Sequence, residues 1–161
     1  MIRITKMTDY GIVLLSRLAI SPDSKAYSVK GLAEAANLPE PTVSKLLKAL
    51  TKSGLLVSTR GVNGGYGLAR KPEQISVAQI IAAIDGPIAI TDCSGELPDR
   101  CEHERMCPVR SNWQKINLAI RDSLEGVTLA QMAGSLPANF VPLRSIAGCE
   151  TSRPHIEVLK S

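Results

Sequence analysis

The segment from Glu40 to Gly54, EPTVSKLLKALTKSG, constrains the fold of this chain more than any other. Pro41 suits the first turn of a helix, where its missing N–H would have no partner, and Gly54 suits the residue after a last turn. The apolar residues between them recur at steps of three and four, as Val43, Leu46, Leu47 and Leu50. This spacing predicts an amphipathic helix with one buried face. Its polar face carries Thr42, Ser44, Lys45, Lys48 and Lys52.

Two further helices are predicted before this one. Thr8 is a candidate N-cap with Asp9 in the first turn, and that helix is expected to end at about Ile20. Ser28 can cap a short second helix that ends near Asn37. A short helix, a tight turn and a helix with a basic face form a helix-turn-helix pattern, which a generic helical hairpin shares. In the DNA-binding motif the start of the second helix meets base edges, so Thr42 and Ser44 are the candidate base contacts. Lys45 and Lys48 are the candidate phosphate contacts.

The next segment, LLVSTRGVNGGYGLAR, predicts a β-hairpin with strands at Leu55–Ser58 and Tyr66–Ala69. A hairpin that follows a recognition helix is a wing, and an arginine on a thin loop can enter a narrow minor groove. Arg60 lies on such a loop and is the candidate minor-groove contact. The alternative is that the hairpin is purely structural and Arg60 is simply exposed. The predicted DNA-binding residues of the hairpin are Arg60, Asn63, Gly64 and Tyr66.

Charge and composition narrow the classes of binding partner and the location that we expect for this chain. From Pro41 to Pro72 there are six basic residues and no acidic one. Such a stretch is typical of a phosphate-binding surface and also of a solvated helix face; together with the helices and the hairpin it predicts winged-helix binding of double-stranded DNA. No run of about eighteen apolar residues is present, so no membrane-spanning segment is expected. The N-terminus lacks the cleavage site of a signal peptide, which makes the cytoplasm the expected location.

The second half of the chain predicts two more helices. Ser76 can cap one that ends at Gly86, and a long one is expected from about Pro108 to Glu125. The long helix has a narrow apolar stripe, made of Val109, Trp113, Ile116, Ile120, Leu124 and Val127. A lone stripe needs a partner, which is either the chain's own core or, as a better fit, a second subunit.

The expected fold class is therefore mainly α with a small β wing. A winged helix-turn-helix DNA-binding domain is predicted at residues 1–86 and a cysteine-bearing segment at 87–107. A dimerisation helix region follows at 108–134, and a mobile tail at 135–161.

Three of the four cysteines lie in the polar segment DCSGELPDRCEHERMCP, residues 92–108. In a reducing cytoplasm, clustered cysteines are more often metal ligands or redox groups than disulfides. One alternative is a zinc site, whose candidate ligands are Cys93, Cys101, His103 and Cys107. Their irregular spacing departs from the paired Cys-x2–4-Cys pattern of such sites. A thiol switch without metal is also open, because Arg100 and Arg105 could favour the reactive thiolate form.

Four stretches of the chain carry a family resemblance: IRITKMTDYGIVLLSRLA, VKGLAEAANLPEPTVSKLLKALTKSGLL, STRGVNGGYGLAR and the cysteine segment. With these stretches in this order, the chain resembles the IscR/NsrR family of bacterial iron–sulfur transcription regulators. The resemblance covers about residues 1–133, and RGVNGGYGL is similar to the family's RG-x-x-GGY signature. It implies a homodimeric repressor that reads a pseudo-palindromic operator and is gated by a 2Fe–2S or 4Fe–4S cluster. TDYGIVLL and the cysteine spacing are similar to the branch that controls the SUF cluster-assembly operon.

The resemblance also implies the cluster ligands. The three thiolates are those of Cys93, Cys101 and Cys107. In one branch the fourth ligand is a histidine three residues after the third cysteine, a place that Arg110 occupies here. In the other branch it is an aspartate at the start of the first helix of the other subunit, which corresponds to Asp9. We expect Asp9 as the fourth ligand and His103 as the alternative, with Cys149 in the tail not involved.

Other classes of function fit less well. No glycine-rich loop follows a strand and opens a helix, so a nucleotide-dependent enzyme is not expected, and His103 and His155 lack a nucleophile partner. A cluster carrier that does not bind DNA would use the same cysteines, but the acid-free stretch from Pro41 to Pro72 argues against it. The chain is accordingly predicted to be a regulator and not an enzyme.

Overall fold

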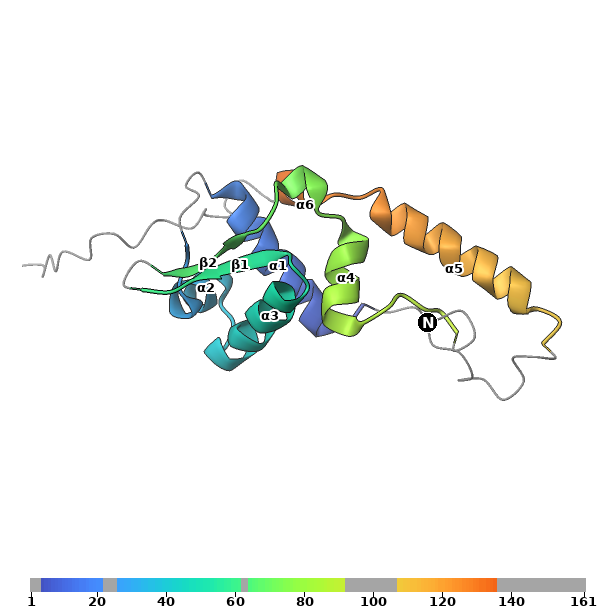
Figure 1. The fold of residues 1–161 in the computed structure, drawn as a ribbon, viewed down its shortest axis with the longest axis horizontal. Coiled ribbons are helices and arrows are strands. Elements are labelled where there is room, and N and C mark those ends of the chain that lie inside the picture. Colours follow the sequence, from blue (N-terminus) through green and yellow to red (C-terminus); the bar gives the residue numbers. More distant parts are fainter. Residues whose placement is uncertain (1–3, 22–25, 62–63, 92–106, 136–161) are drawn as a thin grey trace, which may run out of the picture.

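The computed structural model describes residues 4–21, 26–61, 64–91 and 107–135. Its helices are α1 (Lys6–Ile20), α2 (Val29–Ala36), α3 (Glu40–Lys52), α4 (Val77–Asp85), α5 (Arg110–Glu125) and α6 (Leu129–Gly134), with the short 3-10 helix η1 (Pro72–Gln74). Two antiparallel strands, β1 (Leu56–Thr59) and β2 (Gly65–Leu68), form a hairpin. This mainly helical architecture with a small hairpin, seen in Figure 1, confirms the predicted fold class. None of the helices in the described ranges is long and apolar enough to cross a bilayer.

The N-terminus of α1 differs from the prediction. Its N-cap is Thr5, whose hydroxyl accepts a hydrogen bond from the Thr8 amide at 3.2 Å, so the prediction of Thr8 as the cap is wrong. Thr8 lies in the first turn and is fully buried, and its hydroxyl donates to Asp85 Oδ2 of α4 at 2.7 Å. Both threonines could cap a helix by their local sequence. The hydroxyls of both also bond Asp85 of α4, which is distant in sequence.

The turn between α2 and α3 follows its local sequence signals. Ser28 caps α2 by accepting a hydrogen bond from the Gly31 amide at 3.1 Å. Asn37 ends the helix in the left-handed conformation, with φ of 53°, which asparagine tolerates better than most residues. Pro41 lies in the first turn of α3, and Gly54 follows its last turn with φ of 74°. The predicted bounds of both helices are therefore confirmed to within a residue or two.

The hairpin is joined to the rest of the domain by backbone hydrogen bonds. Each strand lies one residue from its predicted bounds, with Leu56 opposite Leu68. The Tyr27 amide donates to the Tyr66 carbonyl and the Tyr66 amide donates to the Tyr27 carbonyl, both at 2.9 Å. A Cβ atom at Gly65 would lie 2.5 Å from the Tyr27 carbonyl oxygen. Only glycine permits this approach of two backbones, which explains one glycine of the signature.

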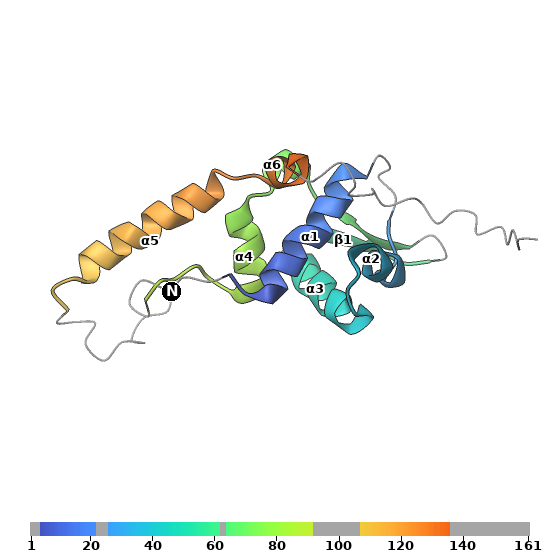
Figure 2. The same ribbon diagram turned by 180° about the vertical axis from the view of Figure 1, so that it is seen from behind.

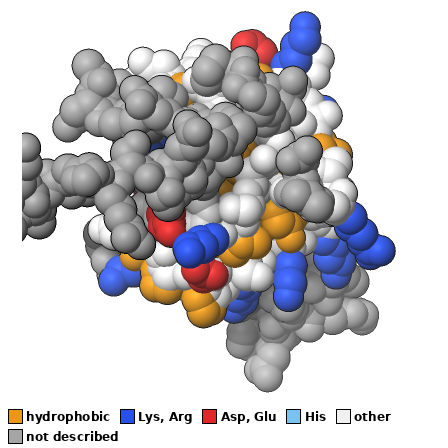
Figure 3. All heavy atoms as spheres, turned by 90° about the vertical axis from the view of Figure 1, so that its left-hand side faces the viewer, with side chains coloured by type: hydrophobic (Ala, Val, Ile, Leu, Met, Phe, Trp, Pro, Cys, Tyr) orange, Lys and Arg blue, Asp and Glu red, His pale blue; other side chains and the backbone are white. Residues whose placement is uncertain are grey.

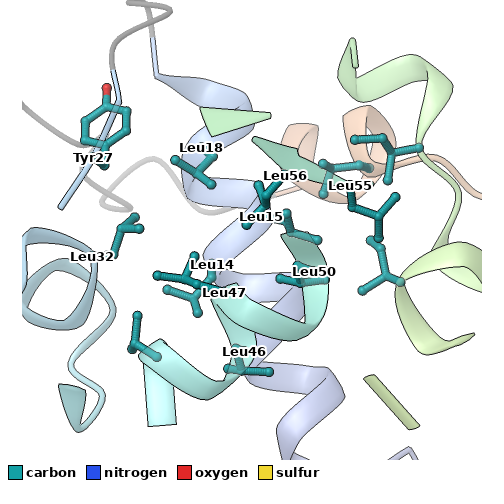
Figure 4. Close-up of a cluster of buried hydrophobic side chains, with 14 of the residues drawn as sticks. Leu14, Leu15, Leu18, Tyr27, Leu32, Leu46, Leu47, Leu50, Leu55 and Leu56 are labelled. Carbon is teal, nitrogen blue, oxygen red and sulfur yellow. The ribbon is translucent and has the colours of Figure 1, made fainter. Parts of the chain in front are cut away.

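An aliphatic core fills the space between α1, α2, α3 and the hairpin (Figure 4). Leu14 and Leu15 of α1 and Leu47 and Leu50 of α3 are all 0% exposed. The predicted apolar stripe of α3 is confirmed, because each of its members is buried. Burying one such leucine contributes about 1.5–3 kcal/mol, so this small cluster is the main source of stability.

Helix α6 brings the chain back to this core. Ser76 and Thr128 are the N-caps of α4 and α6, and their backbones pair as an isolated antiparallel bridge. Leu129, the first residue of α6, is fully buried in the core that α1 and α3 build. The predicted division of the chain into four regions stays a prediction. The structure adds that α6, which was grouped with the dimerisation region, packs on the winged-helix core.

Helix α5 extends away from the core as an arm (Figures 1 and 2). It begins at Arg110 with Val109 as its N-cap, two residues later than predicted, and ends at Glu125 as predicted. The outermost members of the predicted stripe, Val109 and Val127, therefore lie outside the helix. Among the residues of α5, Asn117 is buried while Trp113 and Ile116 are 37% and 44% exposed. The arm thus presents apolar side chains that stay partly exposed in the part of the chain that the structure describes.

Candidate nucleic-acid interface and cysteine segment

The exposed face of α3 carries the predicted phosphate contacts. Lys45 and Lys48 are both exposed, one turn apart, and point away from the buried leucine stripe. Thr42 and Ser44, the predicted base contacts, are half-buried near the start of the helix. Glu40 precedes them in the first turn, where a carboxylate interacts favourably with the helix dipole. The face can therefore offer hydroxyl groups at its N-terminal end and ammonium groups along its length.

The hairpin places Arg60 at the start of its tip. Arg60 is exposed, and Gly61 beside it has φ of 113°, a conformation that favours glycine. A Cβ atom at Gly64 would lie 2.4 Å from the Thr59 carbonyl oxygen, so the narrow tip also depends on a glycine there. Asn63 lies outside the described residues. The predicted contacts of Arg60 and Gly64 with DNA stay predictions, and the structure adds a purely conformational reason for Gly64.

The structure also gives a reason for a tyrosine at position 66 that does not involve DNA. Its backbone pairs with Tyr27, and its half-buried side chain packs against the core. The tyrosine of the GGY signature therefore joins the hairpin to the helices, whatever contact it makes with DNA. Figure 3 views the side toward which the hairpin points, and Lys and Arg side chains gather on one part of it.

The cysteine segment is described only at its end. Cys93, Cys101 and His103 lie outside the described residues, while Cys107 is a half-exposed free thiol three residues before α5 begins. Arg110 is the first residue of α5, and its amide donates to the Cys107 carbonyl at 3.4 Å. No group of three or more His, Cys, Asp and Glu side chains suited to a metal occurs among the described residues. The metal ligands therefore stay predictions.

Asp9, the predicted fourth ligand, is exposed in the first turn of α1. An exposed carboxylate and a half-exposed thiol are both accessible donors, which is compatible with ligation of an iron–sulfur group.

On the same helix, partial burial lowers the pKa of the Arg17 guanidinium by desolvation. Its ordinary pKa is so high that Arg17 stays charged at neutral pH.

Two polar residues that were not predicted as functional, Asp85 and Asn117, join elements far apart in the chain. The carboxylate of Asp85, the last residue of α4, accepts hydrogen bonds from the hydroxyls of Thr5 and Thr8 on α1. Asn117 of α5 accepts from the Ile90 amide at 3.2 Å and donates to the Ile88 carbonyl at 3.1 Å. The one available signal was a lone asparagine among the apolar residues of KINLAI. Nothing local marks Asp85, because its partner Thr8 is 77 residues away.

Comparisons with known proteins bear on the whole of the described chain. The profile of the Rrf2 family, described as an iron-dependent transcriptional regulator, matches residues 4–135. A protein of Synechocystis named as an HTH-type transcriptional regulator is 34% identical over 130 residues, which are 81% of this chain and 86% of that protein.

Two solved structures have the same fold. The structure of IscR from T. potens is similar with a TM-score of 0.58 and 31% identity, over 83% of this chain and 87% of that one. The structure of CymR, the global cysteine regulator of B. subtilis, is similar with a TM-score of 0.63 and 28% identity, over 85% of this chain and 100% of that one. The family and the Synechocystis protein are described as transcriptional regulators, which agrees with the expectation of a regulator and not an enzyme.

Proposed function

The chain belongs to the Rrf2 family of DNA-binding transcriptional regulators, and on that premise we propose that it is a homodimeric repressor whose affinity for its operator depends on an iron–sulfur cluster. The observation that carries the proposal is the combination of a winged helix with three clustered cysteines directly before an arm whose apolar side chains are exposed. The proposed targets are genes for iron–sulfur cluster assembly, by resemblance to the SUF branch. The proposed location is the cytoplasm.

The proposed DNA complex uses α3 and the hairpin. The N-terminal turn of α3 enters the major groove, where Thr42 and Ser44 meet base edges and Lys45 and Lys48 pair with phosphates. Arg60 enters the adjacent minor groove. Asn63, Gly64 and Tyr66 complete the proposed surface.

The proposed dimer uses α5. Trp113 and Ile116, two members of the predicted stripe, are 37% and 44% exposed, an apolar surface that is costly to leave in water. The C-terminal half of the arm is closer to its own chain, because Arg121 and Glu125 line a hollow of about 170 Å³ together with Ala78 and Ala82 of α4. Pairing two arms would place two α3 helices on one side of the dimer, as a pseudo-palindromic operator requires.

The proposed ligands are the thiolates of Cys93, Cys101 and Cys107 with Asp9 of the partner subunit, and His103 is the alternative fourth ligand. When bound, the cluster supplies a bond between the two subunits that depends on iron and on redox state. Asp9 is in the first turn of α1, and α1 packs on α3 through the leucine core. Holding or releasing Asp9 therefore changes the orientation of one winged helix relative to the other.

The test is anaerobic purification followed by visible spectroscopy with iron and sulfide analysis. Cys93→Ala, Cys101→Ala and Cys107→Ala should each remove the visible chromophore, because a lost thiolate leaves the cluster without a ligand. Cys149→Ala is the matched control and should keep full colour. Asp9→Ala should weaken the chromophore more than His103→Ala does. Full colour in all three cysteine variants would rule out the proposed ligands.

The role of the hairpin is tested separately on DNA. Arg60→Ala should weaken operator binding at least about fivefold, near 1 kcal/mol, because a minor-groove contact is lost. Arg70→Ala removes the same charge at the other end of the hairpin, where Arg70 bonds Gln79 at 3.3 Å, and should have a smaller effect. Equal losses in the two variants would mean that net charge, and not the wing, determines the affinity.

A second candidate is a regulator that senses thiol chemistry or zinc without a cluster. The similarity to CymR, the global cysteine regulator of B. subtilis, favours it. The same purified protein distinguishes the two candidates. Zinc without sulfide, or operator binding that responds to thiol oxidants in metal-free protein, would support the second candidate.

A further inference from the structure

The link between the winged helix and the cysteine segment is held at two points by side chains from different helices. The first point is Asp85 at the C-terminal end of α4. Its Oδ1 accepts from the Thr5 hydroxyl at 2.8 Å, and its Oδ2 accepts from the Thr8 hydroxyl at 2.7 Å. Thr5 is also the N-cap of α1, so Asp85 fixes the cap and the first turn together.

The electrostatics of this first point suit the N-terminus of α1. A carboxylate at the C-terminal end of its own helix is unfavourable, because that end carries partial negative charge. Asp85 instead acts on the positive N-terminal end of α1. Thr8 is 0% exposed, and a buried hydroxyl that lost this acceptor would be left without its hydrogen bond, which destabilises the turn. The first turn of α1, which carries Asp9, therefore depends on the position of the end of α4.

The second point is Asn117 on the arm. It is 7% exposed, and its amide binds both the Ile88 carbonyl and the Ile90 amide, as a neighbouring β-strand would. A buried asparagine with both ends bonded to one backbone segment specifies the position of that segment. The segment leads through Thr91 into the cysteine segment, so Asn117 holds the entrance to it against α5.

The two points are close together along the chain. Asp85 and Ile88 are three residues apart, which spans at most about 10 Å of extended backbone. Pro87 has a fixed φ, and Gly86 before it has φ of 92°, a conformation that favours glycine. A displacement of residues 88–90 relative to α5 therefore has only this three-residue link in which to be absorbed, and the remainder reaches Asp85.

We infer that Asp85 and Asn117 are positioning residues that couple the arm and the entrance of the cysteine segment to the first turn of α1. Asn117 fixes residues 88–90 to α5, the short link carries their position to Asp85, and Asp85 sets the N-terminal turn of α1. The coupling is a property of the single chain. Its use for controlling DNA affinity depends on the proposed function.

The first experiment uses the full chain without metal and without DNA. Amide hydrogen exchange is measured by NMR in Asn117→Ala and in the matched control Asn112→Ala, whose side chain is exposed on the same helix. Asn117→Ala should speed exchange at Ile90 at least about tenfold and, through the link, at Thr8 and Asp9 at least about threefold. Asn112→Ala should change none of these. Unchanged exchange at Thr8 and Asp9 would overturn the coupling.

A reciprocal variant covers the case in which Asn117→Ala disturbs the arm as a whole. Asp85→Ala removes the acceptor of both threonine hydroxyls, whereas Asp85→Asn keeps one carbonyl acceptor. Exchange at Ile90 should rise at least about threefold in Asp85→Ala and less in Asp85→Asn. An Ile90 rate equal to that of the wild type in both variants contradicts the inference.

The second experiment asks whether the coupling serves regulation. The ratio of operator affinities between anaerobically loaded and cluster-free protein is measured for the wild type and for Asn117→Ala. The variant should keep the visible spectrum but bring the ratio at least about threefold closer to one. A wild-type ratio of one contradicts the proposed gating and leaves the exchange result to decide the coupling. A normal ratio in Asn117→Ala contradicts a regulatory role for Asn117.

Discussion

Helices α1 and α5 are nearly equal in length, with 15 and 16 residues, but they are stabilised in opposite ways. Helix α1 buries three leucines against α3, α4 and α6, and its polar caps are bonded inside the same domain. Helix α5 leaves Trp113 and Ile116 exposed, and its buried residue is the polar Asn117. Helix α1 is thus covered within the described residues, whereas those same residues position α5 without covering its apolar side chains.

The difference in burial between α1 and α5 is tested most directly by the same substitution in both helices. Leu15→Ala in α1 should lower the free energy of unfolding by about 2–5 kcal/mol, because it opens a cavity in a fully buried site. Leu118→Ala in α5 should cost less than about 0.5 kcal/mol, because that side chain is 56% exposed. Urea unfolding at one fixed protein concentration measures both. Similar losses would mean that α5 is covered as fully as α1.

The exposed side of α5 can be tested by charge. Ile116→Glu should raise the dimer dissociation constant at least about 100-fold, because a carboxylate would be buried in an apolar contact. Lys115→Glu is the matched control on the neighbouring, exposed position and should have little effect. Sedimentation velocity over a range of concentrations measures the dissociation constants. Dimers of normal affinity in Ile116→Glu would place the subunit contact elsewhere.

Two glycines of β2 test how closely the hairpin must approach the domain core. Gly65→Ala should destabilise the fold by about 1–3 kcal/mol, because its Cβ would meet the Tyr27 backbone at 2.5 Å. Gly67→Ala in the same strand should be nearly neutral, since its Cβ would have no neighbour within 4 Å. Thermal unfolding of the two variants measures the difference. Equal stabilities would show that the pairing of Tyr27 with the hairpin contributes little.

The smallest expected effect concerns single charges on DNA. Lys45→Ala should reduce the slope of log affinity against log salt by about 0.9, the value for one lost phosphate contact. Lys115→Ala removes an equal charge from α5 and should leave the slope unchanged. Fluorescence anisotropy with an operator fragment at several salt concentrations measures both slopes. A slope that falls equally in both variants would assign the effect to total charge.

The sequence predicted best what local chemistry decides. Ser28, Pro41 and Gly54 mark helix ends by backbone conformation or capping, and these ends were found. Thr8 was mistaken for the cap because Thr5 and Thr8 both fit the local pattern of an N-cap. Helix α6 was missed although Thr128 and Gln131 form a capping box, since its six residues are too few for a periodic signal.

The candidate site was predictable only in part for the same reason. Lys45, Lys48 and Arg60 lie on exposed positions of elements with clear local patterns. Gly64 and Tyr66 of the signature were predicted as DNA contacts, but Gly64 also permits the narrow hairpin tip and Tyr66 also pairs with Tyr27. Asn117 makes bonds that depend on how α5 lies beside residues 88–90, a tertiary arrangement that periodicity does not encode.

The two hydrogen bonds between Tyr27 and Tyr66 have a consequence for operator sequences. They join the hairpin to the segment that leads into α2. If α3 and the hairpin read the two grooves as proposed, the two readers of one subunit therefore move together. In the proposed dimer, a signal that reorients the subunits then leaves the preferred bases of each half-site unchanged and alters the preferred number of base pairs between half-sites. Operators with one base pair inserted or deleted at their centre would discriminate between the signalled and unsignalled protein, whereas point changes within a half-site would weaken both forms alike.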